Sequence, residues 1–275
     1  MPKRTDLFGA PHTYYVAVQA ALGHALFSTT ADQARTMVGL EQIREAFACR
    51  CYALALERDA LHLVLHHPPL PAGDDEYLRG RWITAGGRSN VPALRLRQRL
   101  GSLSGFMQTL LQRLSRDWNR RHGSRGSLWA RRYRACLLAD DAALLAAIAW
   151  VEEELGSRAV ITSRTLRDVT MPALRLAAPP LRIGPDQQWF PADEGPPGTA
   201  PPANQDLRQW LDRIARELGP EHRRAYGEAL QHGWALGRPE SLTAPLSRLT
   251  RGTGRGRSRR LRHLADDLGL CGVWG

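Results

Sequence analysis

Residues that hold structural metals or form cross-links are scarce in this sequence. The four cysteines are Cys49, Cys51, Cys136 and Cys271, and no two of them form a C-x-x-C pair. This spacing is wrong for a zinc knuckle, and a disulfide framework is not expected in a cytoplasmic chain of 275 residues. We therefore expect all four cysteines to be small, buried, apolar side chains.

Long hydrophobic runs are also absent. No apolar run approaches the ~20 residues of a membrane-spanning helix, and residues 1–12 contain no hydrophobic region of the signal-peptide type. We therefore expect no membrane partner and a cytoplasmic location. The length is sufficient for one sizeable core and a smaller second unit.

Acidic residues and lysine are in short supply. The sequence has 27 acidic residues against 38 basic ones, which gives a net charge of +11, and Lys3 is the one lysine. A positive field of this kind attracts nucleic acid or an anionic membrane without specifying either. A GC-rich genome would also favour arginine over lysine without any selection for binding. The excess of arginine is therefore weak evidence for a nucleic-acid partner when taken alone.

The hydrophobic pattern predicts an α+β fold. Strands are expected at 13–20, 50–57 and 60–66, helices at about 30–47, 102–121 and 140–155, and a polar loop at 72–93. Because a short polar turn joins the second and third strands, they are expected to form a hairpin. We expect a small antiparallel sheet with helices packed on one face.

The composition divides the chain into three parts. Residues 1–176 contain these elements, 177–204 are rich in proline and are expected to form a linker, and 205–275 are expected to form a helical C-terminal region. That region ends in a glycine- and arginine-rich basic tail at 251–263. Such tails sometimes bind nucleic acid.

The stretch 119–134, NRRHGSRGSLWARRYR, is the most distinctive in the sequence. It holds six arginines and one histidine, separated by Gly123, Gly126, Trp129 and Tyr133. Arginine matches phosphate oxygens, glycine lets the backbone approach a phosphodiester, and aromatic rings stack on bases. A solvated basic loop between two helices is the simpler alternative for a charge run.

The order of these elements, together with this arginine-rich turn, resembles the REP-associated tyrosine transposases, which are single-strand DNA transposases with an HUH motif. The matching positions are Asn119, Arg120, Arg121, Gly123, Gly126, Leu128, Trp129, Arg132 and Tyr133. Residues 225–239 also resemble the end region of that family. The resemblance implies an HUH-transposase-like fold, single-stranded or hairpin DNA as the ligand, and a homodimer.

The catalytic residues of that family are not matched. Its chemistry uses two histidines at i and i+2 of a strand to hold Mg²⁺ or Mn²⁺, and a tyrosine nucleophile on a following helix. Here His62 occupies the second histidine position, Ala60 the first, and Leu114 the tyrosine position. His66 shares a strand face with His62, but four residues span about 13 Å, which one metal ion cannot bridge. We therefore expect cleavage to be lost and no cofactor to be required, and we retain His62 only as a remnant metal ligand.

The expected DNA-binding residues are those of the turn and of the preceding helix. They are Arg113, Arg116, Asn119, Arg120, Arg121, Arg125, Trp129, Arg131, Arg132, Tyr133 and Arg134. The arginines would neutralise phosphates. For Trp129 we prefer a role in anchoring the turn to the core over a role in stacking a base.

Two alternatives stay open at this point. An active transposase with substitute residues would need Mg²⁺ or Mn²⁺ and would form a covalent adduct on Tyr77, Tyr133 or Tyr226. An RNA-binding regulatory module is the second alternative, because an arginine-rich turn and a glycine–arginine tail serve RNA equally well.

Overall fold

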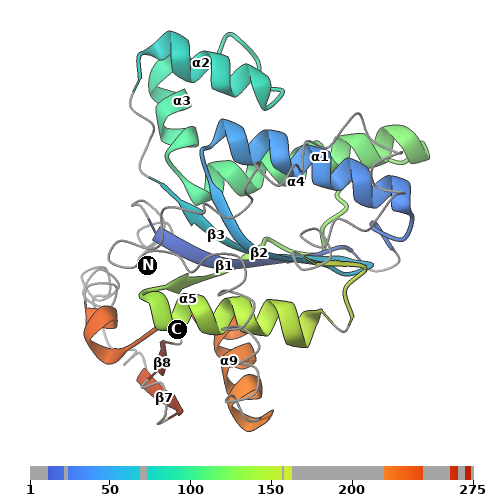
Figure 1. Ribbon diagram of the computed structural model, residues 1–275. Coiled ribbons are helices and arrows are strands. Elements are labelled where there is room, and N and C mark those ends of the chain that lie inside the picture. The colour runs from blue at the N-terminus through green and yellow to red at the C-terminus, as the bar shows by residue number, and fades with distance from the viewer. Residues whose placement is uncertain are drawn as a thin grey trace, which may run out of the picture.

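The computed structural model describes residues 12–21, 24–68, 73–156, 158–162, 220–243, 261–265 and 270–273. The α+β class is confirmed, with helices packed around a mixed sheet (Figure 1). The proposed linker at 177–204 and residues 251–260 of the basic tail lie outside the described residues.

Within the described residues, eight strands form one sheet in the order β5-β2-β3-β1-β4-β6-β8-β7. The strands are β1 (His12–Gln19), β2 (Arg50–Leu56), β3 (Ala60–His67), β4 (Arg134–Leu138), β5 (Ile161–Thr162), β6 (Ala235–Gly237), β7 (Leu261–Ala265) and β8 (Leu270–Val273). The strands β2, β3, β1 and β4 pair antiparallel, with β2 and β3 as the expected hairpin. The sheet is mixed because β6 runs parallel to β4.

The described helices include the three that the sequence predicts, at about 30–47, 102–121 and 140–155, and others that it does not predict. They are α1 (Thr30–Ala46), α2 (Asp75–Thr84), α3 (Ala93–Leu100), α4 (Leu103–His122), α5 (Asp141–Ala149), the π-helix η2 (Trp150–Leu155) and α9 (Pro220–His232). The Ser102 hydroxyl caps α4 by accepting a hydrogen bond from the Gly105 backbone, and Gly123 ends the helix with a φ of 61°. None of the helices in the described ranges is long and apolar enough to cross a bilayer.

Helices cover both faces of the sheet, which corrects the expectation of one covered face. Along β1, Tyr14 and Val16 face the cluster under α1 and α4, whereas Tyr15 faces the cluster under α5, η2 and α9 (Figure 1). The central strands have near-continuous apolar runs, which is the pattern of strands that are buried on both faces. The sheet, with eight strands in the described residues, is also wider than the small sheet we expected.

Several segments differ from the expected secondary structure, among them α3 and β4, which were not predicted. The polar loop at 72–93 contains α2, which is capped by Asp74 and buries Leu78 and Trp82. The C-terminal region is not purely helical, because β6, β7 and β8 extend the sheet. Strands of three to five residues are too short for a period to be recognised in the sequence. All four cysteines are buried, as expected.

Candidate nucleic-acid interface

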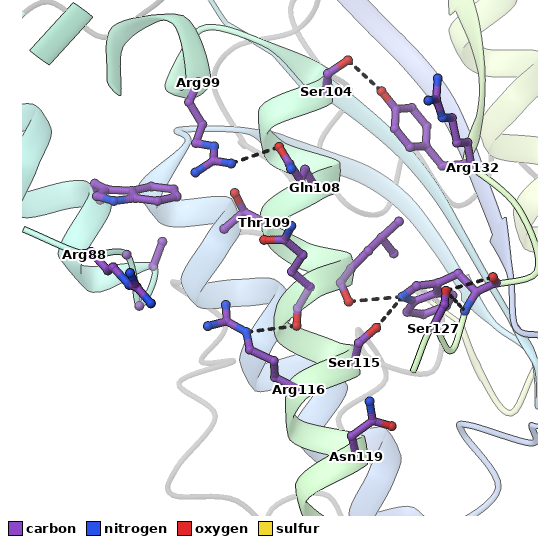
Figure 2. A pocket seen from close by; sticks show the side chains of 18 of the residues that line it. Arg88, Arg99, Ser104, Gln108, Thr109, Ser115, Arg116, Asn119, Ser127 and Arg132 are labelled. Carbon is purple, nitrogen blue, oxygen red and sulfur yellow. Dashed lines mark hydrogen bonds between the residues drawn. The ribbon is translucent and has the colours of Figure 1, made fainter. Parts of the chain in front are cut away.

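A groove of about 1060 Å³ runs along the exposed side of α4. Its walls are the loop at 85–91 with the ends of α2 and α3 on one side, and the turn at 126–135 on the other. Figure 2 shows Arg88 and Arg99 on one side of α4, Arg132 on the other, and Arg116 on α4 itself. No aspartate or glutamate is among the described residues that line it, so the groove is a concentration of unopposed positive charge.

The floor of the groove is a polar stripe on α4. The stripe consists of Ser104, Gln108, Gln112, Ser115, Arg116 and Asn119. These positions are spaced mostly three or four residues apart, which places them on one face of a helix. The opposite face of α4 is buried through Leu103, Phe106 and Leu110. The amphipathicity of α4 thus directs hydroxyl and amide groups into the groove.

Two of the predicted phosphate contacts instead hold helices together. Arg113 donates to the Gln42 side chain of α1 and, at 3.4 Å, to the carbonyl of Ala85, and burial lowers its pKa. Arg121 pairs with Asp32 at the start of α1 and with Asp117 at 3.1 Å. Since Asp32 is only 3% exposed, Arg121 neutralises a buried charge. Both guanidinium groups are therefore engaged within the protein.

Two further predicted arginines, Arg120 and Arg134, do not line the groove. Arg120 forms an ion pair with Asp117 at 2.9 Å and lies outside the groove lining. Arg134 faces the other side of the sheet, where it donates to the carbonyl of Gln231 in α9 at 3.3 Å. Arg134 is therefore separated from the groove by the sheet.

Four predicted arginines remain exposed around the groove. Arg116 and Arg132 line it. Arg125 and Arg131 lie in the same turn, and neither forms a hydrogen bond or an ion pair with the part of the chain that the structure describes. The structure thus brings together some, but not all, of the cations that we predicted.

The turn between α4 and β4 is fixed to α4 by its aromatic residues. The Trp129 indole donates to the Ser115 hydroxyl at 2.9 Å and to the carbonyl of Leu111 at 3.1 Å. The Tyr133 hydroxyl lies 3.0 Å from the Ser104 hydroxyl. Trp129 therefore occupies the anchoring position, and its nitrogen is not free for a ligand.

Asn119 performs a similar task at the tip of the turn. Its amide nitrogen donates to the carbonyl of Gly126 at 3.0 Å, and its amide oxygen accepts from the Ser124 hydroxyl at 2.8 Å. Gly123 and Gly126 have φ angles of 61° and 102°, which favour glycine. The turn is thus held in one conformation, and the Asn119 side chain is used within it.

Sequence reasoning missed Arg88 and Arg99. Arg99 donates to Gln108 at 3.0 Å, and its guanidinium carbon lies 5.1 Å from the centre of the Trp82 ring. Arg88 is exposed at the rim. The alternating arginines of α3 could have indicated a basic surface, but nothing local indicates that α3 packs beside α4.

A second basic hollow of about 500 Å³ continues the groove toward α1. Arg35 on α1 lines it together with Arg113, Arg120 and Asp117. Arg116 and the residues 85–86 line both hollows. The positive surface therefore extends beyond the groove along the side of α4.

The remnant metal ligand lies on the other face of the sheet. His62 is buried, and its Nδ1 atom is 2.7 Å from the Tyr15 hydroxyl under η2. Burial, with a smaller contribution from Arg158, lowers the pKa of His62 to about 4. Leu114 packs against the core beneath α4. Within one chain the sheet therefore separates the position of the nucleophile from that of the metal ligand.

No three or more His, Cys, Asp and Glu side chains in the described ranges are arranged to hold a metal ion. His66, on the same strand face as His62, bonds to the Thr13 hydroxyl at 3.2 Å. Glu57 Oε1 is 3.8 Å from His62 Nε2 and 3.6 Å from Arg158 Nε. The contacts of these residues are therefore made within the protein, and the residues do not form a ligand set.

The three tyrosines proposed for an alternative nucleophile differ in their access. Tyr226 is 1% exposed under the sheet, and Tyr77 is half-exposed on α2, where it accepts from Arg81 at 2.8 Å. Tyr133 alone among the three lines the groove in the described structure.

The sequence matches no protein-family model, and no curated protein matches it significantly.

Proposed function

We propose that this protein binds single-stranded or hairpin DNA in the groove along α4 and does not cleave it. The observation that carries this proposal is the lining of the groove. Four arginines and a stripe of amides and hydroxyls face one concave surface, with no acidic side chain among the described lining residues.

The charge distribution favours a polyanion as the ligand. Like charges that converge on one groove repel one another, and an anion between them relieves the repulsion. A concave surface lined by one sign of charge also focuses the field and increases the rate of encounter. A small anion would occupy one or two of the four arginines, whereas a chain of phosphates can contact all of them.

The polar and planar groups favour a nucleic-acid strand over other polyanions. The guanidinium of Arg99 is held over Trp82 and bonded to Gln108, so a planar cation is fixed at the wall of the groove. Guanidinium planes stack on unpaired bases, and amides bind base edges. These groups are accessible to the bases of a single strand or a loop, because duplex bases are stacked inward. The resemblance of the turn to REP-associated tyrosine transposases favours DNA.

The absence of cleavage follows from the residues at the two catalytic positions. Leu114 has no nucleophilic atom, and Ala60 supplies no metal ligand. An active enzyme would therefore depend on Tyr133, the tyrosine at the groove, and on metal ligands other than the described histidines.

The proposal is tested by the salt dependence of binding to a labelled single-stranded oligonucleotide. If the four groove arginines contact phosphates, log Kobs falls against log salt with a slope of about −3. The double variant Arg116→Ala and Arg132→Ala should reduce the magnitude of the slope by about half. Arg224→Ala is a matched control, because Arg224 is an exposed arginine on α9 beneath the other face of the sheet.

Failure to bind at low salt, or a slope shallower than about −1, would exclude this mode of binding. An equal loss in the Arg224→Ala control would show that the groove is not the site. The same hairpin prepared as RNA separates the DNA proposal from the RNA-binding alternative, which predicts tighter binding of the RNA form.

A further inference from the structure

The three amide side chains on the floor of the groove differ in how they are used within the protein. The amide oxygen of Gln108 accepts from Arg99, and both amide atoms of Asn119 hold the tip of the turn. Gln112 lies one helical turn beyond Gln108 and is exposed. Its side-chain amide has no hydrogen-bond partner in the part of the chain that the structure describes.

The surroundings of Gln112 place it between positive charges. Arg116 lies one turn further along α4, and its Nε atom donates to the backbone carbonyl of Gln112 at 3.2 Å. Arg99 lies on the preceding side, bonded to Gln108. A strand whose successive phosphates contact Arg99 and Arg116 would place the base between them over Gln112.

A free primary amide distinguishes adenine on the base edge that carries N7 in purines, because no other base sets a hydrogen-bond donor beside an acceptor there. Glutamine offers a donor and an acceptor side by side, which match the N7 acceptor and the N6 amino group of adenine in a bidentate pair. Gln108 lacks this capacity because its oxygen is occupied, and Asn119 lacks it because both amide atoms are occupied. In a single strand this edge of adenine is exposed.

We propose that Gln112 selects adenine at one position of the bound strand, an inference that rests on the proposed function of the groove. The arginines then supply affinity that is independent of sequence, and Gln112 supplies the discrimination between bases. Gln112 is a specificity-determining residue in this scheme.

The test compares an eight-nucleotide oligo-dT with the same oligonucleotide carrying one central dA. We expect the dA form to bind about tenfold more tightly to the unmodified protein, as for one bidentate pair. Gln112→Ala should abolish this preference and leave the salt slope unchanged. Replacing dA by 7-deaza-dA removes the N7 acceptor and should lower the affinity of the unmodified protein alone. Gln98→Ala is the matched control that retains the preference, because Gln98 is an exposed glutamine of α3 outside the groove lining.

The outcomes separate the inference from the proposed function. Equal affinity for both oligonucleotides, or a preference that survives in Gln112→Ala, overturns the role of Gln112 while the groove remains a binding site. No binding of either oligonucleotide overturns both. Because Gln112 is exposed, an unchanged thermal unfolding midpoint shows that the variant is folded.

Discussion

The indole nitrogen of Trp129 lies 2.9 Å from the hydroxyl of Ser115, and this hydrogen bond joins the arginine-rich turn to the helix that precedes it. The same nitrogen also donates to the carbonyl of Leu111. Trp129 is thus one of the side chains that hold this wall of the groove against its floor, together with Tyr133 and Asn119. The position of Arg132 and of the other arginines in the turn depends on that contact.

Trp129→Phe should weaken both the fold and the groove. The substitution keeps an aromatic ring but removes both hydrogen bonds, so we expect the free energy of unfolding in urea to fall by about 1 kcal/mol. Oligonucleotide affinity should fall as well, because the turn is no longer fixed. Ser115→Ala removes one of the two acceptors and should have the smaller effect on both measurements. Unchanged affinity in Trp129→Phe would contradict a role for the turn in binding.

Arg121→Ala should lower stability without changing the salt dependence of binding. The substitution removes the arginine partner of the buried Asp32 carboxylate, and we expect a loss of about 2 kcal/mol in urea unfolding because this charge keeps only the Thr29 hydroxyl and the more distant His122 ring. The salt slope should match that of the unmodified protein, since this guanidinium is already paired. A reduced slope would instead show that Arg121 contacts phosphate when DNA is bound.

Stability should fall in mild acid because the buried His62 and the half-buried His66 are held neutral. Burial lowers the pKa values of His62 and His66 from 6.5 to about 4 in the folded protein. The unfolded chain therefore binds more protons below pH 6.5. The stability from the neutral histidines is fully present above that pH and is lost as the pH falls through the folded pKa.

The pH effect is measured as the urea unfolding free energy between pH 7.5 and pH 4.5. His62→Gln retains a hydrogen-bonding partner for Tyr15. The variant should lose the part of the stability change between pH 7.5 and pH 4.5 that comes from His62. An identical pH dependence in this variant would show that His62 does not contribute.

Restoring the family residues should not restore cleavage within one chain. The double variant Ala60→His and Leu114→Tyr places its histidines and its tyrosine on opposite faces of the sheet. We therefore expect no covalent adduct with a DNA hairpin and Mn²⁺ on a denaturing gel. An adduct formed by the double variant would contradict this expectation. An adduct that also forms in a mixture of the two single variants would show that two copies complete the site, as in the expected homodimer.

The first half of the fold was predictable because its signals are local. The cap at Ser102 and the apolar spacing along α4 define that helix to within two residues, and short apolar runs define β1, β2 and β3. The placement of helices on both faces was missed because a continuous apolar run does not indicate which neighbour covers each face. The C-terminal strands were missed because a segment such as Ala235–Gly237 contains too few residues to show a period.

The candidate site was less predictable than the fold. The arginine-rich turn and the helix before it identified one wall and the floor of the groove, with two of its four cations, Arg132 and Arg116. The pairing of Arg121 with Asp32 joins residues 89 positions apart, and no local pattern indicates it. Arg88 and Arg99 belong to a segment whose weak apolar pattern gave no reason to place it beside α4.

The parallel pairing of β6 with β4 makes one edge of the central sheet depend on residues that follow α9. Leu137 of β4 pairs with Ala235, so this pairing cannot form until residue 235 has been synthesised. A protein shortened before α9 would present β4 as an unprotected edge, which is a template for aggregation. A late nonsense mutation in the gene would therefore produce an insoluble polypeptide, even though every arginine of the groove had already been translated.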